Sequence, residues 1–170
     1  MRGSGKKVAL CGLLAALGVV ILLLAGWIGI GTYAGPLLAG LLLVPVQREY
    51  GGKIALTLWA AMGLLSLFLV PDVEESLMFL AFFGWYPAVR PSLEKLPTVP
   101  RWLVKELVFN AAMIAVEALM IFVLAPEAVF WGMALVLLAL FNLIFLAYDR
   151  ALPQVEQLLA RRLKIGRAHV

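Results

Sequence analysis

The amino-acid sequence predicts an all-α integral membrane protein, a bundle of six transmembrane helices, from its composition, its six apolar stretches and the placement of its charges. The chain of 170 residues is 64% hydrophobic and only 14% charged, whereas soluble domains are about 45–50% apolar. Six apolar stretches lie between positions 8 and 148. Six spans of about 20 residues leave no room for a soluble catalytic domain.

Lys and Arg occupy only alternate connections between these stretches. Before the first stretch lie Arg2, Lys6 and Lys7, and after the second lie Arg48 and Lys53. After the fourth lie Arg90, Lys95, Arg101 and Lys105, and after the sixth lie Arg150, Arg161, Arg162 and Lys164. The other three connections contain Asp72, Glu74, Glu75 and Glu127 instead. Because short basic loops stay in the cytoplasm, we expect a multi-pass protein of the cell (inner or plasma) membrane with both termini cytoplasmic. The net charge of +4 then reflects sidedness and does not indicate nucleic-acid binding.

The spans are expected over residues 8–28, 36–46, 53–70, 74–89, 102–125 and 126–148. The second is too short alone, so it has to recruit residues 32–35 or tilt little, and Pro45 should kink its end. Trp85 and Tyr86 are placed near the inner interface. The Pro-containing inner connection 90–101 is expected to be the longest loop.

Three segments follow from this assignment. Residues 1–152 form the membrane domain. Residues 153–164 are expected to form an amphipathic cytoplasmic helix on the membrane surface, because Val155, Leu158, Leu159 and Leu163 recur at helical spacing. Residues 165–170 resemble the translation of a sequencing adapter, so the natural C-terminus is expected to differ beyond Lys164, and His169 is set aside.

Glu117 is the main candidate for a functional residue. It lies about eight positions from the outer end of the fifth span, roughly 12 Å deep at 1.5 Å per residue. A carboxylate at that depth costs several kcal/mol unless it is paired, hydrated or protonated. We therefore expect either a ligand-binding or ion-coupling role, or a protonated carboxyl that bonds to a neighbouring helix.

A solute pocket is predicted above Glu117, under the Gly-rich connection that precedes the second span. Its expected lining is Thr32, Tyr33, Glu117 and Trp131, with Glu74 or Glu75 at the rim. Such a pocket favours a small solute that is partly aromatic or cationic. The alternatives are that both rim glutamates face water at a solvated helix start, and that the aromatic residues belong to an interfacial belt.

Asn110 and Asn142 are each 16 residues from the turn near Pro126, so they should lie at one depth on neighbouring helices. Two amides at the same depth can bond across a helix pair. We expect a structural contact; the alternative is contact with a ligand.

Catalytic and cofactor motifs are absent from the sequence. It contains no phosphate-binding glycine loop, no HExxH and no CxxC, so we expect no cofactor, no metal site and no enzymatic activity. Cys11 is the single cysteine and is expected to be a small buried residue. A membrane enzyme that uses Glu117 on a lipid would lack a second catalytic group.

The first span is rich in small residues over Ala9-Leu10-Cys11-Gly12-Leu13-Leu14-Ala15-Ala16-Leu17-Gly18, in which Cys11/Ala15 and Gly12/Ala16 are four residues apart. With the loop Gly31-Thr32-Tyr33-Ala34-Gly35-Pro36 and a short second span, this pattern resembles the S components of energy-coupling factor (ECF) transporters. The chain is also similar to small uncharacterised bacterial membrane proteins.

The resemblance implies a solute-binding membrane subunit that takes a vitamin-like or cationic molecule from the outer face. It also implies transfer to an ATP-driven module, with Cys11, Gly12, Ala15 and Ala16 facing the transmembrane coupling subunit. The alternative function is that of a non-catalytic membrane scaffold or assembly protein, for which an apolar surface suffices.

Overall fold

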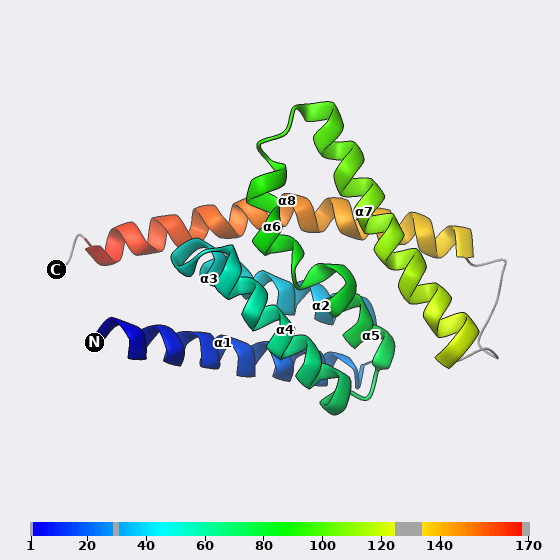
Figure 1. The fold of residues 1–170 in the computed structure, drawn as a ribbon, viewed down its shortest axis with the longest axis horizontal. Helices are drawn as coiled ribbons and strands as arrows, with labels where there is room; N and C mark the ends of the chain where they lie inside the picture. The colour runs from blue at the N-terminus through cyan, green and yellow to red at the C-terminus, as the bar shows by residue number, and fades with distance from the viewer. Residues whose placement is uncertain (1, 29–30, 125–133, 168–170) are drawn as a thin grey trace.

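The structure, a computed structural model, describes residues 2–28, 31–124 and 134–167 (Figure 1). These residues form helices and no strand. The elements are α1 (Arg2–Ala25), α2 (Gly31–Leu41), α3 (Leu43–Tyr50), α4 (Gly52–Leu69), α5 (Val73–Met78), η1 (Phe79–Phe83), α6 (Tyr86–Leu93), α7 (Thr98–Leu119), η2 (Met120–Leu124) and α8 (Ala134–Arg167).

Three helical segments are long and apolar enough to cross a membrane: Lys7–Ala25, Gly52–Leu69 and Thr98–Leu124. These coincide with the first, third and fifth predicted spans. The second and fourth predicted spans are each built from shorter helices in sequence, α2 with α3 and α5 with η1 and α6. The six-span arrangement stays a prediction, with which the position of both termini on one side in Figure 1 agrees.

Helix α2 confirms that the second stretch recruits the residues before Pro36, because it begins at Gly31. Pro36 lies inside α2, beyond its first turn, so the helix lacks the hydrogen bond that an N–H at this position would donate to the Thr32 carbonyl. The break between α2 and α3 falls at Leu42, whose N–H donates to the Ala39 carbonyl at 3.2 Å. Pro45 explains the break, because it has no N–H to donate to the carbonyl of Leu41 four residues before.

A π-helical turn, η1, joins α5 to α6 and presents several aromatic rings to the interior. Pro87 has no N–H for the Phe83 carbonyl four residues earlier. The buried Tyr148 hydroxyl of α8 donates to that carbonyl instead, at 2.8 Å. A Cβ on Gly40 would overlap both groups, so α2 can approach this contact only through a glycine.

The interior consists of two apolar clusters. One is aromatic and joins η1, α6, α7 and α8; its rings include Phe82, Phe83, Tyr86, Phe109, Phe145 and Tyr148. The other is mainly aliphatic and joins α1 to α4, with Val19, Leu22, Ala39, Leu43 and Met62 among its members. Tyr86, predicted near the interface, is a core residue with 1% of its surface exposed.

Two connections differ from the sequence-based expectation. Only residues 94–97 separate α6 from α7, so the connection 90–101 is mostly helical, with Pro91 inside α6. Residues 153–164 continue α8 through Pro153 and are not a separate helix. Val155 and Leu159 pack against the aromatic cluster, and Arg48 of α3 donates to the Glu156 carbonyl. Tertiary contacts therefore hold part of the face that we expected to lie on the membrane.

Candidate functional site

An acidic cluster, defined as Thr32, Tyr33, Asp72, Glu74, Glu75 and Glu117, forms where α2, α5 and α7 meet. Helix α5 contacts both α2 and α7. Asp72 is the N-cap of α5: its Oδ1 accepts from the Glu75 N–H at 3.2 Å, and its Oδ2 accepts from the Thr32 hydroxyl at 2.5 Å. Capping by Asp fits the helix dipole and satisfies one of the free N–H groups of the first turn.

Glu75 is the unusual member of this cluster. None of its surface is exposed, and neither carboxylate oxygen has a hydrogen-bond partner among the described residues. A Cβ on Gly35 would overlap this carboxylate, and one on Gly26 would lie 3.0 Å from Oε2, so glycine backbone of α2 and of the turn after α1 surrounds it. The alternative in which Glu75 faces water at a solvated helix start is wrong, because the ends of α1 and α2 cover the first turn of α5.

The structure brings together most of the residues that were predicted to line a solute pocket. Tyr33 lies within electrostatic range of Asp72, Glu74 and Glu117, and Glu74 within range of Asp72 and Glu117. Glu74 and Glu117 are half-buried. The remaining predicted residue, Trp131, lies outside the described residues. Four carboxylates thus share one region, while residues 8–47, 54–89 and 106–149 contain no Lys or Arg.

The four small residues of α1 that were predicted to face a partner divide into two pairs. Cys11 and Ala15 are half-buried and pack against the aliphatic cluster of this chain. Gly12 and Ala16 are exposed, and a Cβ on Gly12 would meet nothing within 4 Å. Only Gly12 and Ala16 are therefore free to contact a partner helix.

The prediction for the two asparagines is confirmed. Asn110 Nδ2 donates to Asn142 Oδ1, and Asn142 Nδ2 donates to Asn110 Oδ1, both at 3.0 Å. Each amide also donates to a backbone carbonyl one turn before it, of Glu106 and Leu138 respectively. Both amides are thus engaged in a contact between α7 and α8.

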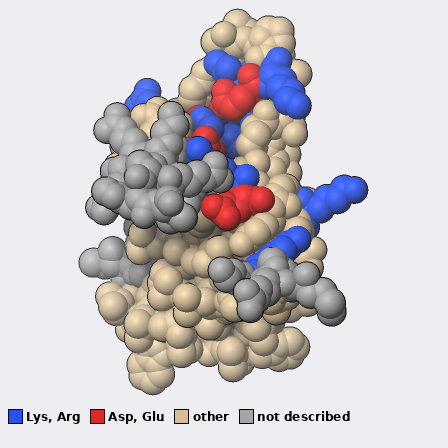
Figure 2. Space-filling model, turned by 90° about the vertical axis from the view of Figure 1, so that its left-hand side faces the viewer, with Lys and Arg blue, Asp and Glu red and all other residues tan. Residues whose placement is uncertain are grey.

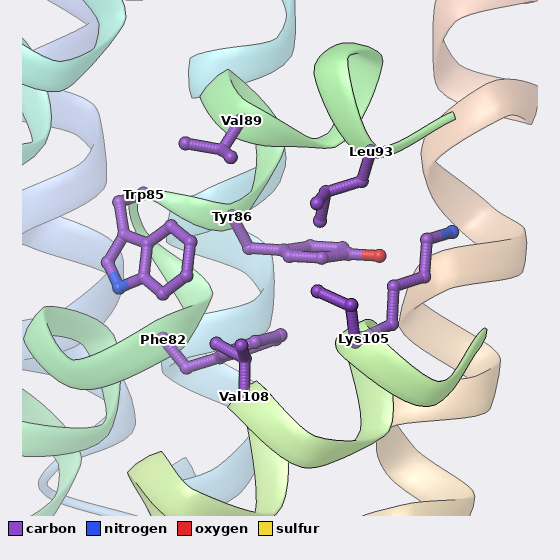
Figure 3. Close-up of a pocket in the computed structure, with 8 residues that line it drawn as sticks. Phe82, Trp85, Tyr86, Val89, Leu93, Lys105 and Val108 are labelled. Atoms are coloured by element: carbon purple, nitrogen blue, oxygen red, sulfur yellow. The ribbon is translucent and has the colours of Figure 1, made fainter. Parts of the chain in front are cut away.

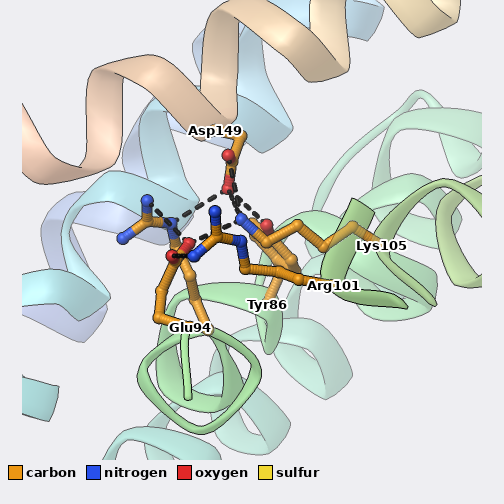
Figure 4. Close-up of polar contacts among 6 residues, drawn as sticks. Tyr86, Glu94, Arg101, Lys105 and Asp149 are labelled. Carbon is orange, nitrogen blue, oxygen red and sulfur yellow. Dashed lines mark hydrogen bonds and ion pairs between the residues drawn. The ribbon is translucent and has the colours of Figure 1, made fainter. Parts of the chain in front are cut away.

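A second polar cluster, the ion network, comprises Tyr86, Arg90, Glu94, Arg101, Lys105 and Asp149 (Figure 4). Its centre is Lys105 of α7, which is 1% exposed. The Lys105 ammonium donates to Glu94 Oε1 at 2.6 Å and to both Asp149 oxygens at 2.9 and 3.0 Å. Asp149 also accepts from the Tyr86 hydroxyl and from Arg90 Nε. Burial of Lys105 and Asp149 is tolerated because each has several partners.

Glu94 lies at the exposed edge of the ion network, in the connection between α6 and α7. Burial acts to raise the pKa of its carboxyl, but the hydrogen bond from Lys105 and the charges of Arg90, Lys105 and Arg101 outweigh it, so the pKa is lowered from 4.5. Arg90 and Arg101 reach Glu94 at 3.1 and 3.0 Å. Figure 2, viewed from the side on which both termini lie, shows charged residues from the top of the molecule to just below its middle, and tan residues at the bottom.

Sequence reasoning missed the ion network, although it had used three of its basic residues to assign sidedness. Lys105 was assigned to a connection, yet it lies two turns inside α7. Because Lys105 and Glu106 both belong to α7, Glu117 is not the only charged residue of that helix. The sequence did contain one indication of the ion network. Glu94 and Asp149 lie beside basic connections that are expected at the same end of the predicted bundle. Their pairing with Lys105 could not be deduced, because it depends on the packing of α7 against α8.

Among the described residues, no three His, Cys, Asp or Glu side chains are grouped so that they could hold a metal ion. Comparison of the chain with models of protein families, with curated proteins and with solved structures found no match.

Proposed function

We propose that this protein is a membrane-embedded solute-binding subunit that captures a small cationic molecule at the acidic cluster, from the outer face of the membrane. The observation that supports this most strongly is Glu75, a fully buried carboxyl without a donor among the described residues. An unpaired ionised carboxylate in an apolar interior is costly, so such a group binds a proton or a cation.

The surroundings of Glu75 favour an organic cation over a metal ion. Asp72, Glu74 and Glu117 add three carboxyl groups to the region, but no three acidic residues described here converge as metal ligands would. Tyr33 supplies an aromatic face in the same region, and aromatic faces attract alkylammonium groups. An amine-bearing or quaternary ammonium solute matches this combination of distributed charge and an aromatic ring.

Binding of organic cations to the purified protein tests this proposal. A panel of aliphatic and aromatic ammonium compounds, each with an uncharged analogue, is titrated against the wild type and against Glu75→Gln and Glu117→Gln. Removing one partner of a buried charge pair costs about 2–5 kcal/mol, so the two variants should bind the preferred cation far more weakly. Native mass spectrometry of protein purified without added solute would identify a ligand that is retained from the cell.

The matched control is Glu49→Gln, which makes the same chemical change at an exposed position. It should leave binding unchanged. If Glu75→Gln and Glu117→Gln fold normally and bind every cation like the wild type, the carboxyls are protonated structural groups, and the scaffold alternative gains support.

We further propose that α1 delivers the solute to an ATP-driven coupling module through a transmembrane partner that contacts Gly12 and Ala16. Large residues at outward-facing small positions block close helix approach and leave the fold of this chain intact. Gly12→Leu and Ala16→Leu should therefore abolish uptake in cells and preserve binding. On the same helix, a side chain on the inward-facing Gly18 would overlap Met62, so Gly18→Leu should lose both. Normal uptake by both outward variants would contradict the coupling proposal.

A further inference from the structure

An apolar groove between η1, α6 and α7 lies next to the ion network (Figure 3). It encloses about 130 Å³ and is lined by Phe82, Trp85, Tyr86, Val89, Leu93, Val104, Lys105 and Val108. An apolar cavity of about 150 Å³ is known to stay dry and to accept a benzene-sized group. The groove is therefore large enough for a short stretch of hydrocarbon.

The polar ends of two lining residues are occupied elsewhere. The Tyr86 hydroxyl and the Lys105 ammonium both bond to Asp149 of α8, and Figure 3 shows the Lys105 side chain extending toward the α8 ribbon. The indole N–H of Trp85 donates to the Ala81 carbonyl at 2.7 Å. The lumen consequently offers hydrocarbon and ring faces, and a polar solute would find no hydrogen bonds there.

The groove lies on a part of α7 whose outer surface is apolar. Leu103 and Leu107, adjacent in sequence to the lining residues Val104 and Val108, are 65% and 72% exposed. In a segment apolar enough to span a membrane, such a face contacts lipid chains. The material that would fill an apolar groove beside this face is an acyl chain of the bilayer.

Positive charge lies at the Leu93 and Lys105 end of the groove. The ion network contains Arg90, Arg101 and Lys105 against Glu94 and Asp149, that is three positive and two negative charges, or a net +1. Arg101 is partly exposed, and Lys95 in the same connection is exposed. Basic groups at the cytoplasmic end of transmembrane helices attract anionic lipid headgroups.

We propose that this groove is a binding site for a phospholipid with an anionic headgroup. One acyl chain lies against Phe82, Val104 and Val108, and the headgroup phosphate contacts Arg101 and Lys95. The site is separate from the acidic cluster and does not depend on the proposed solute. A bound chain would cover the gap between α6 and α7 and so support the helices that hold the ion network.

The test measures lipid binding to purified protein by native mass spectrometry with phosphatidylglycerol and phosphatidylcholine. The wild type should retain phosphatidylglycerol at least about tenfold better than phosphatidylcholine, which corresponds to about 1.4 kcal/mol. Val108→Phe fills the groove and should reduce retention of both lipids, whereas Leu107→Phe, at the neighbouring exposed position, should change neither. Arg101→Gln should remove the preference for phosphatidylglycerol and keep the binding of phosphatidylcholine.

Equal retention of the two lipids by the wild type would overturn the headgroup assignment, and normal retention by a folded Val108→Phe would overturn the groove. If Val108→Phe does not fold, the exposed-edge variant Arg101→Gln decides: an unchanged preference for phosphatidylglycerol contradicts the proposal, and loss of that preference supports it.

Discussion

Among single residues, Lys105 and Glu75 show two different ways to bury an ionisable group. Lys105 is surrounded by Glu94 and Asp149 and donates three hydrogen bonds. Glu75 has no donor among the described residues. Because an unpaired buried charge costs far more than a paired one, Lys105 has the partners of a structural residue, whereas Glu75 is the residue to which the proposed function assigns cation binding.

Asp149→Asn should destabilise the fold strongly, because it leaves the buried Lys105 ammonium with only the half-exposed Glu94 as a charged partner. Breaking a buried ion pair by removing one partner costs about 3–5 kcal/mol. The measurement is the free energy of unfolding in detergent micelles, with Lys53→Met, at an exposed position outside both polar clusters, as a control. A loss below about 0.5 kcal/mol, the range of ordinary surface substitutions, would show that Asp149 is not required to hold Lys105.

The stability of the ion network should also depend on pH through Glu94. Because the folded-state pKa of Glu94 is below its ordinary value of 4.5, its contribution is fully present above that value and disappears as pH falls through the folded-state pKa. Glu94→Gln should therefore be less stable than the wild type at about pH 7, and the difference should shrink as pH falls below 4.5 and through the folded-state pKa of Glu94. The exposed Glu49→Gln variant is the control. A difference between wild type and Glu94→Gln that persists in acid would show that charge is not the cause.

At the scale of helices, prolines and polar side chains determine where segments break and where they join. Pro45 separates α2 from α3, and Pro87 frees the Phe83 carbonyl that Tyr148 then binds. Asn110 and Asn142 fix the register of α7 against α8. Each contact replaces or adds a hydrogen bond where hydrocarbon offers none.

A double-mutant cycle on Asn110→Ala and Asn142→Ala should show a small favourable coupling. Hydrogen bonds between membrane helices average about 0.6 kcal/mol and reach about 1.7 kcal/mol, and this pair has two. The coupling is obtained from the free energies of unfolding of the wild type, both single variants and the double variant. Additive single effects would mean that the two amides are satisfied separately, by the Glu106 and Leu138 carbonyls.

For the whole molecule, the distribution of basic residues predicts six spans with both termini in the cytoplasm, and three segments have transmembrane length and composition in the structure. Reporter fusions test the remaining spans. Fusions after Ile30, Val73 and Glu127 should be external, and those after Tyr50, Leu96 and Leu152 internal. A reversed result at any two of these sites would reject the six-span topology.

By itself, the sequence determined the helical class, the apolar segments and the asparagine pair. Hydropathy is a local property of the sequence, and Asn110 and Asn142 lie at equal distances along the chain from one turn. Both can be read from the sequence without knowing how the helices pack. The recruitment of residues 32–35 into the second helix followed from length alone.

Only the tertiary structure decided which charges are buried and which partners they meet. Glu75 was expected at the rim of a pocket or facing water, yet it is fully buried beside Gly26 and Gly35. Lys105 was assigned to a loop, but Glu94 of the connection between α6 and α7 and Asp149 of α8 reach it from 11 and 44 residues away. Whether a charge is buried depends on the side chains that other helices place around it. The order of residues along the chain does not show which helices pack together, so the surroundings of Glu75 and the partners of Lys105 could not be predicted from it.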